Sequence, residues 1–152
     1  MAIEERYPCI ASASGRDILL VDTSDIVHLG LEGCSNISDQ CIVDVVHRCR
    51  KLRSIDLGSC GQVTDAGVLA LSMGCGQLQS IDLHCCSQVT DAGVIVLSAG
   101  CGKLQSINLH CCYQVTDAGV IALGAGCGQL LSIILLLSGD RCRRHSVECR
   151  MW

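Results

Sequence analysis

The stretch "LQSIDLHCCSQVTDAGVIVLSAGCGK" at residues 78–103 returns as "LQSINLHCCYQVTDAGVIALGAGCGQ" at residues 104–129, with differences at only five positions. The same pattern runs through residues 52–77, and a more divergent copy fills residues 26–51. A fifth copy begins at residue 130 and loses the pattern after residue 138. The period is therefore 26 residues, and a fixed period of this length indicates a solenoid built from stacked repeats.

Within each unit the spacing of the apolar residues changes from that of a strand to that of a helix. In "LQSIDL" (78–83) the apolar residues include the i, i+2 alternation of a short, half-buried strand. Val94 and Leu97 then follow at helical spacing, after Thr90 as a candidate N-cap, and Gly100 is expected to mark the end of the helix. Each unit is predicted to be a strand, a turn, a short helix and a return.

Such units are expected to stack into a right-handed α/β solenoid shaped as a horseshoe arc. Parallel strands would form the concave face and short helices the convex face. Residues 1–25 are a candidate partial cap, and the basic Cys/Arg-rich tail at 139–152 is expected to be irregular. The repeats cover residues 26–138, divided as 26–51, 52–77, 78–103, 104–129 and a partial unit at 130–138.

The composition limits the class of protein. Hydrophobic residues make up 49% of the 152 residues and charged residues 17%, so the chain is expected to form one globular domain. A net charge of -4 argues against nucleic acid or an anionic membrane as the main partner. The longest apolar run, "SIILLLS" at 132–138, is far shorter than the roughly 20 residues of a membrane helix. The opening residues contain no secretory signal, so a cytoplasmic location is expected, with the nucleus as the alternative.

The repeated pattern L-x-x-I-x-L-x-x-C-x-x-V-T-D-x-G-V-x-x-L-x-x-x-C resembles the cysteine-containing class of leucine-rich repeat. That class occurs in F-box proteins and in relatives of the antagonist of the mitotic exit network. The resemblance implies a concave face that binds proteins. Members that carry an F-box use the arc to hold substrates of a Skp-cullin-F-box ubiquitin ligase, although residues 1–25 contain no recognisable F-box here.

Most of the 14 cysteines are interpreted as packing elements. No two of them stand three residues apart, which excludes a C-x-x-C redox motif and a paired zinc knuckle. A cysteine thiol behaves as a small buried hydrophobe with a weak donor, and reduced thiols are expected in the cytoplasm. Two inward-facing columns are predicted: Cys34, Cys60, Cys86 and Cys112 at the strand ends, and Cys49, Cys75, Cys101 and Cys127 along the helices.

No metal ion, cofactor or catalytic residue is predicted. His84 and His110, with Asp82, could form a weak metal site, but a solvated polar ladder is the preferred interpretation. The tail offers a second set of possible metal ligands at helical spacing, Cys142, His145 and Cys149, but the spacing matches no standard zinc knuckle. Nucleophile elbows, phosphate-binding glycine loops and H-E-x-x-H motifs are absent from the sequence.

The expected function is therefore a non-enzymatic protein-protein interaction module, whose partner could be a ubiquitin-ligase substrate or scaffold. The alternative is a structural or truncated repeat fragment with no dedicated partner, which self-associates through its C-terminal strand. Ile134, Leu136 and Leu137 make that strand apolar on both faces and form the candidate association edge. The candidate partner-binding residues on the concave face are Arg53, Asp56, Gln79, Asp82, His84, Gln105, Asn108 and His110.

Overall fold

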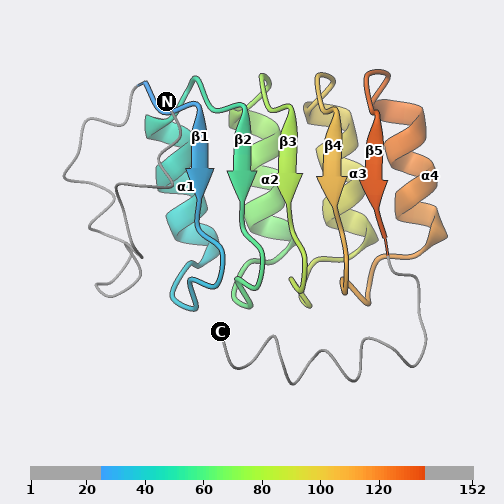
Figure 1. Ribbon diagram of the computed structural model, residues 1–152, viewed down its shortest axis with the longest axis horizontal. Coiled ribbons are helices and arrows are strands. Elements are labelled where there is room, and N and C mark those ends of the chain that lie inside the picture. Colours follow the sequence, from blue (N-terminus) through green and yellow to red (C-terminus); the bar gives the residue numbers. More distant parts are fainter. Residues whose placement is uncertain (1–24, 136–152) are drawn as a thin grey trace.

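The computed structural model describes residues 25–135, in which five parallel strands form one sheet in the order β1-β2-β3-β4-β5 (Figure 1). The strands are β1 (His28–Gly30), β2 (Ser54–Asp56), β3 (Ser80–Asp82), β4 (Ser106–Asn108) and β5 (Ser132–Ile134). The helices between them are α1 (Asp39–Arg48), α2 (Asp65–Gly74), α3 (Asp91–Gly100) and α4 (Asp117–Gly126). This is the strand-and-helix alternation that the sequence predicts.

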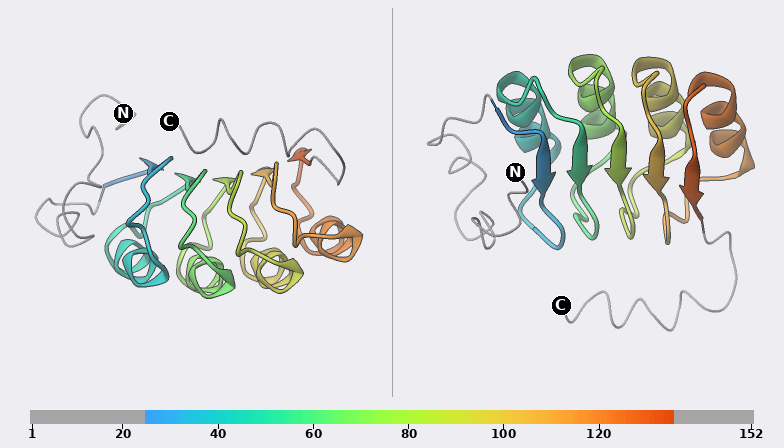
Figure 2. Two further views of the ribbon diagram at one scale, coloured as in Figure 1. Left: turned by 90° about the horizontal axis from the view of Figure 1, so that it is seen from below. Right: turned by 45° about the horizontal axis from the view of Figure 1, so that its top comes forward.

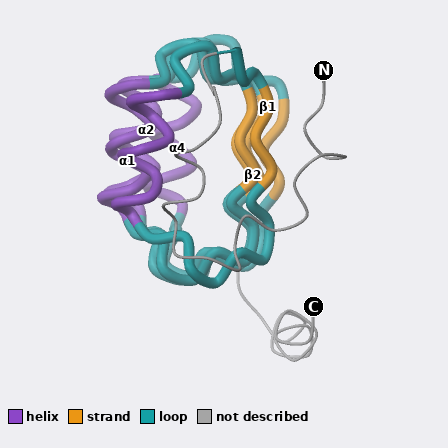
Figure 3. Tube along the Cα trace, turned by 90° about the vertical axis from the view of Figure 1, so that its left-hand side faces the viewer, coloured by secondary structure: helices purple, strands orange, loops and turns teal. Residues whose placement is uncertain are grey.

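The strands and the helices form two opposite walls of one coil (Figure 3). Figure 2 shows the helices spread further apart than the strands, which places the strands on the concave face as expected. The apolar core fills the space between the walls, where Ile81, Leu83 and Leu97 are at most 1% exposed. Within residues 25–135, no helix has the length and apolar character required to span a membrane.

Each strand pairs with the next at a shift of one repeat, so that Ile55 lies beside Ile81 and Asp56 beside Asp82. The assigned strands have only three residues, yet the backbone ladder continues beyond them. The Leu57 amide donates to the Asp82 carbonyl at 2.9 Å, and the Leu83 amide makes the equivalent bond to the next repeat at 2.9 Å. Every repeat therefore supplies backbone partners for its neighbour, both in the strand and in the turn that follows.

The turn after each of the strands β1 to β4 contains a residue in the left-handed conformation. At this position an L residue with a Cβ incurs a cost of about 1–2 kcal/mol. The conformation allows the amide of the turn residue to reach the next repeat: the Ser59 amide donates to the His84 carbonyl at 2.7 Å. These inter-repeat bonds offset the local cost. The four equivalent residues are Gly33 (φ 70), Ser59 (φ 60), Cys85 (φ 59) and Cys111 (φ 61).

The aspartates that open α1, α2 and α3 each bond to the following repeat, in an arrangement that we call the aspartate–threonine bridge. Thr116 caps its own helix, because its hydroxyl oxygen accepts from the Ala118 amide at 3.3 Å. The Asp91 carboxylate in turn accepts from the Thr116 amide at 2.7 Å and from the Thr116 hydroxyl at 2.6 Å. The Gly119 amide adds a bond of 3.1 Å. The Thr116 hydroxyl and amide together lower the pKa of Asp91.

The same bridge joins the earlier repeats, from Asp39 to Thr64 and from Asp65 to Thr90. It also explains the glycine of the T-D-x-G turn. A Cβ on Gly119 would lie 2.6 Å from Asp91 Oδ1, which is too close for any side chain. The glycine is therefore required by the approach of the preceding aspartate.

The glycines at the helix ends have a packing role in addition to the one that the sequence suggests. Gly100 and Gly126 are the last helical residues, and the C-cap is a cysteine with a negative φ in each case. A Cβ on Gly126 would lie 2.7 Å from the Ser98 carbonyl oxygen of the preceding helix. Gly100 therefore marks the end of its helix as predicted, and these glycines also allow close packing between neighbouring helices.

Both predicted cysteine columns are buried, with all eight side chains at most 6% exposed. At the strand ends, the Cys86 thiol donates to the Leu57 carbonyl at 3.1 Å and the Cys112 thiol to the Leu83 carbonyl at 3.0 Å. Burial raises the pKa of Cys112 to about 12. The thiol is therefore protonated at neutral pH and serves as a donor between repeats, which agrees with its interpretation as a packing element.

Candidate functional site on the concave face

The eight residues predicted to face a partner form three columns on the concave face, because they recur at the repeat spacing. Arg53 is exposed and the other seven are half-buried. Several of the half-buried residues form hydrogen bonds to their own turns and to one another, which reduces their exposure to solvent. The columns are Arg53, Gln79 and Gln105 before the strands, Asp56, Asp82 and Asn108 at the strand ends, and His84 and His110 in the turns.

The column at the strand ends fastens each strand to its turn. The Oδ1 atom of Asp56, Asp82 or Asn108 accepts from the backbone amide two residues later, at 2.9, 2.9 and 3.0 Å respectively. Asn108 Nδ2 also donates to Asp82 Oδ2 at 2.9 Å. The Asp82 carboxylate is therefore held from two sides, and it has a defined orientation on this face.

His84 turns toward the N-terminal repeats. Its Nδ1 atom lies 2.8 Å from Asp82 Oδ1. Its ring occupies the space above Gly58, where any Cβ would collide with the imidazole. Its Nε2 atom is 3.4 Å from the Ser59 hydroxyl and 3.5 Å from Glu32 Oε1, two repeats away.

The pairing of the two histidines that was considered from the sequence is therefore not the arrangement in the structure. The ring of His84 bonds to Asp82 and lies over Gly58. His110 Nδ1 instead lies 3.3 Å from Cys111 Sγ in its own turn. The two rings follow different paths because Gly58 leaves an open space beside His84 on the side of the second repeat.

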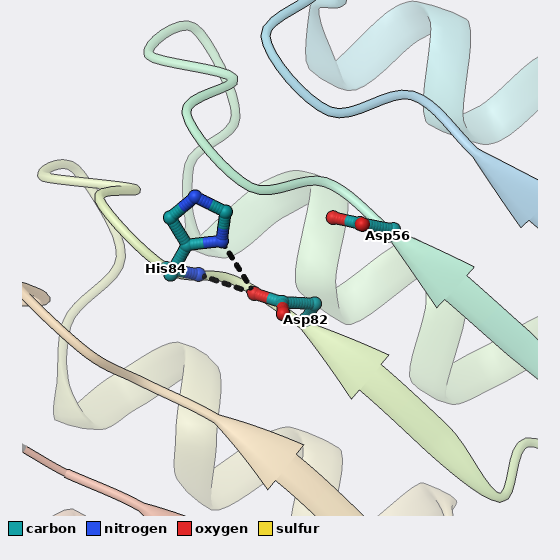
Figure 4. Close-up of side chains that lie close together, drawn as sticks. All are labelled: Asp56, Asp82 and His84. Atoms are coloured by element: carbon teal, nitrogen blue, oxygen red, sulfur yellow. Dashed lines mark hydrogen bonds and ion pairs between the residues drawn. The ribbon is translucent and has the colours of Figure 1, made fainter. Parts of the chain in front are cut away.

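Asp56, Asp82 and His84 form a half-buried cluster whose ligand atoms all lie within 4.8 Å of one another. Figure 4 shows both carboxylates directed toward the same side of the His84 ring. Burial raises the pKa of Asp56, and the neighbouring carboxylates of Asp82 and Glu32 raise it further. In the part of the chain that the structure describes, Asp56 forms no ion pair. The cluster is thus an acidic spot on the concave face with one imidazole beside it.

Two residues of this site are missed by the sequence analysis, Glu32 and Gly58. The repeat period places both in the same column as His84, so the sequence register shows that they are neighbours. It does not show that Glu32 and His84 approach each other, because that contact depends on the direction of the His84 ring across the gap at Gly58. A search for glycine beside a bulky residue in one column could have found the contact.

The C-terminal end of the array leaves apolar side chains at the surface. In β5, Ile134 is 51% exposed, and Leu131 just before the strand is 84% exposed. The other two predicted edge residues, Leu136 and Leu137, lie outside the described residues, as do the tail set Cys142, His145 and Cys149 and almost all of the N-terminal segment 1–25.

Comparisons with known proteins agree with this architecture. A family model described as Leucine Rich repeat matches residues 48–72. No curated protein matches the chain at a significant level. A chain in the crystal structure of the yeast Rad7 and Elc1 complex superposes with a TM-score of 0.67 at 19% identity. That match covers 81% of this chain and 31% of the yeast chain, so this chain spans about a third of its length.

A second solved structure, the tropomodulin C-terminal domain of Caenorhabditis elegans, superposes with a TM-score of 0.60 at 12% identity. The match covers 90% of this chain and 89% of that domain. At these identities the likeness concerns the fold. Together with the five-stranded parallel sheet, it confirms the prediction of a leucine-rich-repeat solenoid.

Replacing Asp56 by asparagine is expected to stabilise the protein at neutral pH. The amide keeps the turn bond, as Asn108 does at the equivalent position, and removes a charge that faces Asp82 and Glu32. Like charges on neighbouring strands cost about 0.2–1 kcal/mol, and partial solvent exposure keeps the gain within that range. Urea unfolding at pH 7 with a reducing agent measures the difference in the free energy of unfolding.

The pH dependence of this gain has a defined sign. Because the pKa of Asp56 is raised in the folded protein, its charge lowers stability at neutral pH. The cost disappears as the pH falls through that raised pKa toward the ordinary value of 3.8. The advantage of Asp56→Asn should therefore shrink in acid, and a loss of stability at pH 7 would contradict the assignment.

Proposed function

We propose that this protein is a non-enzymatic interaction module that binds a protein partner on its concave face. The observation that supports this most directly is the arrangement of polar side chains there, which stand in register over the strands at known spacing. Arg53 provides an exposed cation before β2, and Asp56 and Asp82 provide half-buried carboxylates after β2 and β3. A partner with complementary charges along an extended surface fits this pattern.

The finer proposal is a role in substrate recognition by a ubiquitin ligase. It rests on the resemblance of the repeats to those of F-box proteins and on the structural likeness to a chain crystallised in a complex of Rad7 with Elc1. The concave face of five strands about 5 Å apart spans roughly 25 Å and offers a patch of about a few hundred Å², which is small beside a standard interface of about 800 Å² per partner. High affinity would therefore depend on a further subunit or segment.

A binding experiment with the full chain tests both levels of this proposal. We expect purified Skp-type adaptor and cullin to form a stoichiometric complex with the chain. We also expect that substrate proteins which crosslink to the native chain in cells do not crosslink to a variant whose concave face is changed. The variant Arg53→Glu, Gln79→Glu, Gln105→Glu changes one column, and Leu69→Glu on the exposed side of α2 is the control. Failure to bind adaptor and cullin would overturn the ligase role, and equal capture by both variants would overturn the concave site.

Self-association through the C-terminal end is a second candidate, because that end differs from every internal junction. The Asp117 carboxylate occupies the position from which Asp91 reaches the next repeat, and no described residue donates a hydrogen bond to it. In the same repeat and in the segment that follows it, Ile121 is 71% exposed and Leu131 84% exposed, and β5 leaves one strand edge unpaired within the described sheet. An exposed apolar strand edge is a template for pairing with another chain.

Light scattering coupled to size exclusion tests this second candidate. The native chain should form a dimer or larger species at tens of micromolar, and Leu131→Glu with Ile134→Asp should shift it to a monomer. Met73→Glu is a matched control, since Met73 is 80% exposed on α2 in the interior of the array. A native chain that runs as a monomer, or a control that dissociates as fully as the edge variant, would exclude the edge as the contact.

A further inference from the structure

The cluster of Asp56, Asp82 and His84 combines ligand types that bind divalent metal ions. Two carboxylates and one imidazole are a mixed oxygen and nitrogen set, which suits first-row metals such as manganese and zinc. The three ligand atoms already lie within 4.8 Å of one another. An ion at the usual bond lengths of about 2.0–2.2 Å would therefore require only a small closure of the side chains.

Each ligand is oriented by a further contact, which is the feature that separates a metal site from a chance group of acids. Asp56 Oδ1 and Asp82 Oδ1 each accept a backbone amide at 2.9 Å, which fixes both carboxylates at their strand ends. Asn108 Nδ2 holds Asp82 Oδ2 at 2.9 Å and leaves Oδ1 directed toward the His84 ring. Both carboxylates therefore have a fixed direction without any ion.

The imidazole is oriented as well. Its Nδ1 atom faces the carboxylates, at 2.8 Å from Asp82 Oδ1. Its Nε2 atom faces Glu32 Oε1 at 3.5 Å and the Ser59 hydroxyl at 3.4 Å. A bound ion would replace the hydrogen bond between Nδ1 and Asp82 Oδ1, with its proton released to solvent, and Nε2 would keep the ring's other proton, directed toward Glu32 and Ser59. A carboxylate behind the second nitrogen is a regular feature of metal-binding histidines.

The charge balance also favours a cation. The neighbourhood of Asp56 contains the carboxylates of Asp82 and Glu32, and the ion pairs of these two within the described residues are made only with His84. Within the described residues, no lysine or arginine forms an ion pair with Asp56, Asp82 or Glu32. A divalent ion would offset the repulsion between the carboxylates and occupy the side of the ring to which Figure 4 shows them directed.

We infer that Asp56, Asp82 and His84 form a binding site for one divalent first-row metal ion on the concave face, with Glu32 as the residue that orients His84. The ion would join the second and third repeats at the surface where a partner is expected. Its remaining coordination positions would face solvent and accept water or a carboxylate from a bound protein.

Manganese is the appropriate probe, because it prefers oxygen and nitrogen ligands and avoids the many thiols of this chain. Electron paramagnetic resonance of MnCl₂ titrated into the full chain, kept reduced, measures the loss of the aqueous Mn²⁺ signal. We expect one bound ion per chain in the micromolar to submillimolar range. Asp56→Asn should weaken binding at least about tenfold, and His84→Ala by a similar factor.

His110→Ala is the matched control, since it removes the equivalent histidine of the next repeat, where Asn108 stands in place of the carboxylate. It should change the affinity by less than about twofold. Asp56→Asn keeps the turn bond, so its loss of binding cannot be attributed to unfolding, and circular dichroism under the same conditions verifies this. Absence of binding at millimolar Mn²⁺, or equal binding by the native chain and Asp56→Asn, would overturn the site.

Discussion

The aspartate–threonine bridge is the interaction on which the rest of the structure depends. In each bridge, the aspartate carboxylate that opens one helix accepts hydrogen bonds from the start of the next helix. Asp91, for example, accepts from the Thr116 amide and hydroxyl. A repeat with a three-residue strand and a ten-residue helix cannot bury its own apolar face. The bridge, the thiol bonds such as Cys86 to Leu57, and the backbone ladder all cross the junction, so stability arises between repeats.

The two ends of the described array differ in how they can continue this pattern. On the N-terminal side, Cys41 takes the place of the glycine that admits an aspartate, and Arg48 takes the place of the glycine that packs against the preceding helix. The first repeat is therefore not shaped to accept another repeat of the same kind. In the last repeat, no described residue bonds to the Asp117 carboxylate, and Ile134 is 51% exposed. This asymmetry directs the search for an additional partner to the C-terminal end.

Much of the fold could be predicted from the sequence because the period fixes the register. The strand at Ser80–Asp82, the N-cap at Thr90 and the buried cysteines all follow from apolar spacing and turn chemistry. The left-handed turns could not be predicted, because Cys85 has no glycine-like signal and its conformation is imposed by the next repeat. The metal-type cluster was found only in part, because the sequence grouped Asp82 and His84 with His110 rather than with Asp56. The period places Asp56 beside Asp82, but the direction of the His84 ring depends on the space at Gly58.

A double-mutant cycle on Asp91 and Thr116 tests the central claim most directly. Asp91→Ala, Thr116→Val and the double variant are unfolded in urea at pH 7, and the cycle removes the helix-capping effects that each side chain has alone. The account predicts a favourable coupling energy of about 1–3 kcal/mol, as expected for hydrogen bonds to a charged group between two repeats. A coupling energy indistinguishable from zero would show that the bridge does not hold the repeats together, and the account of the fold would be wrong.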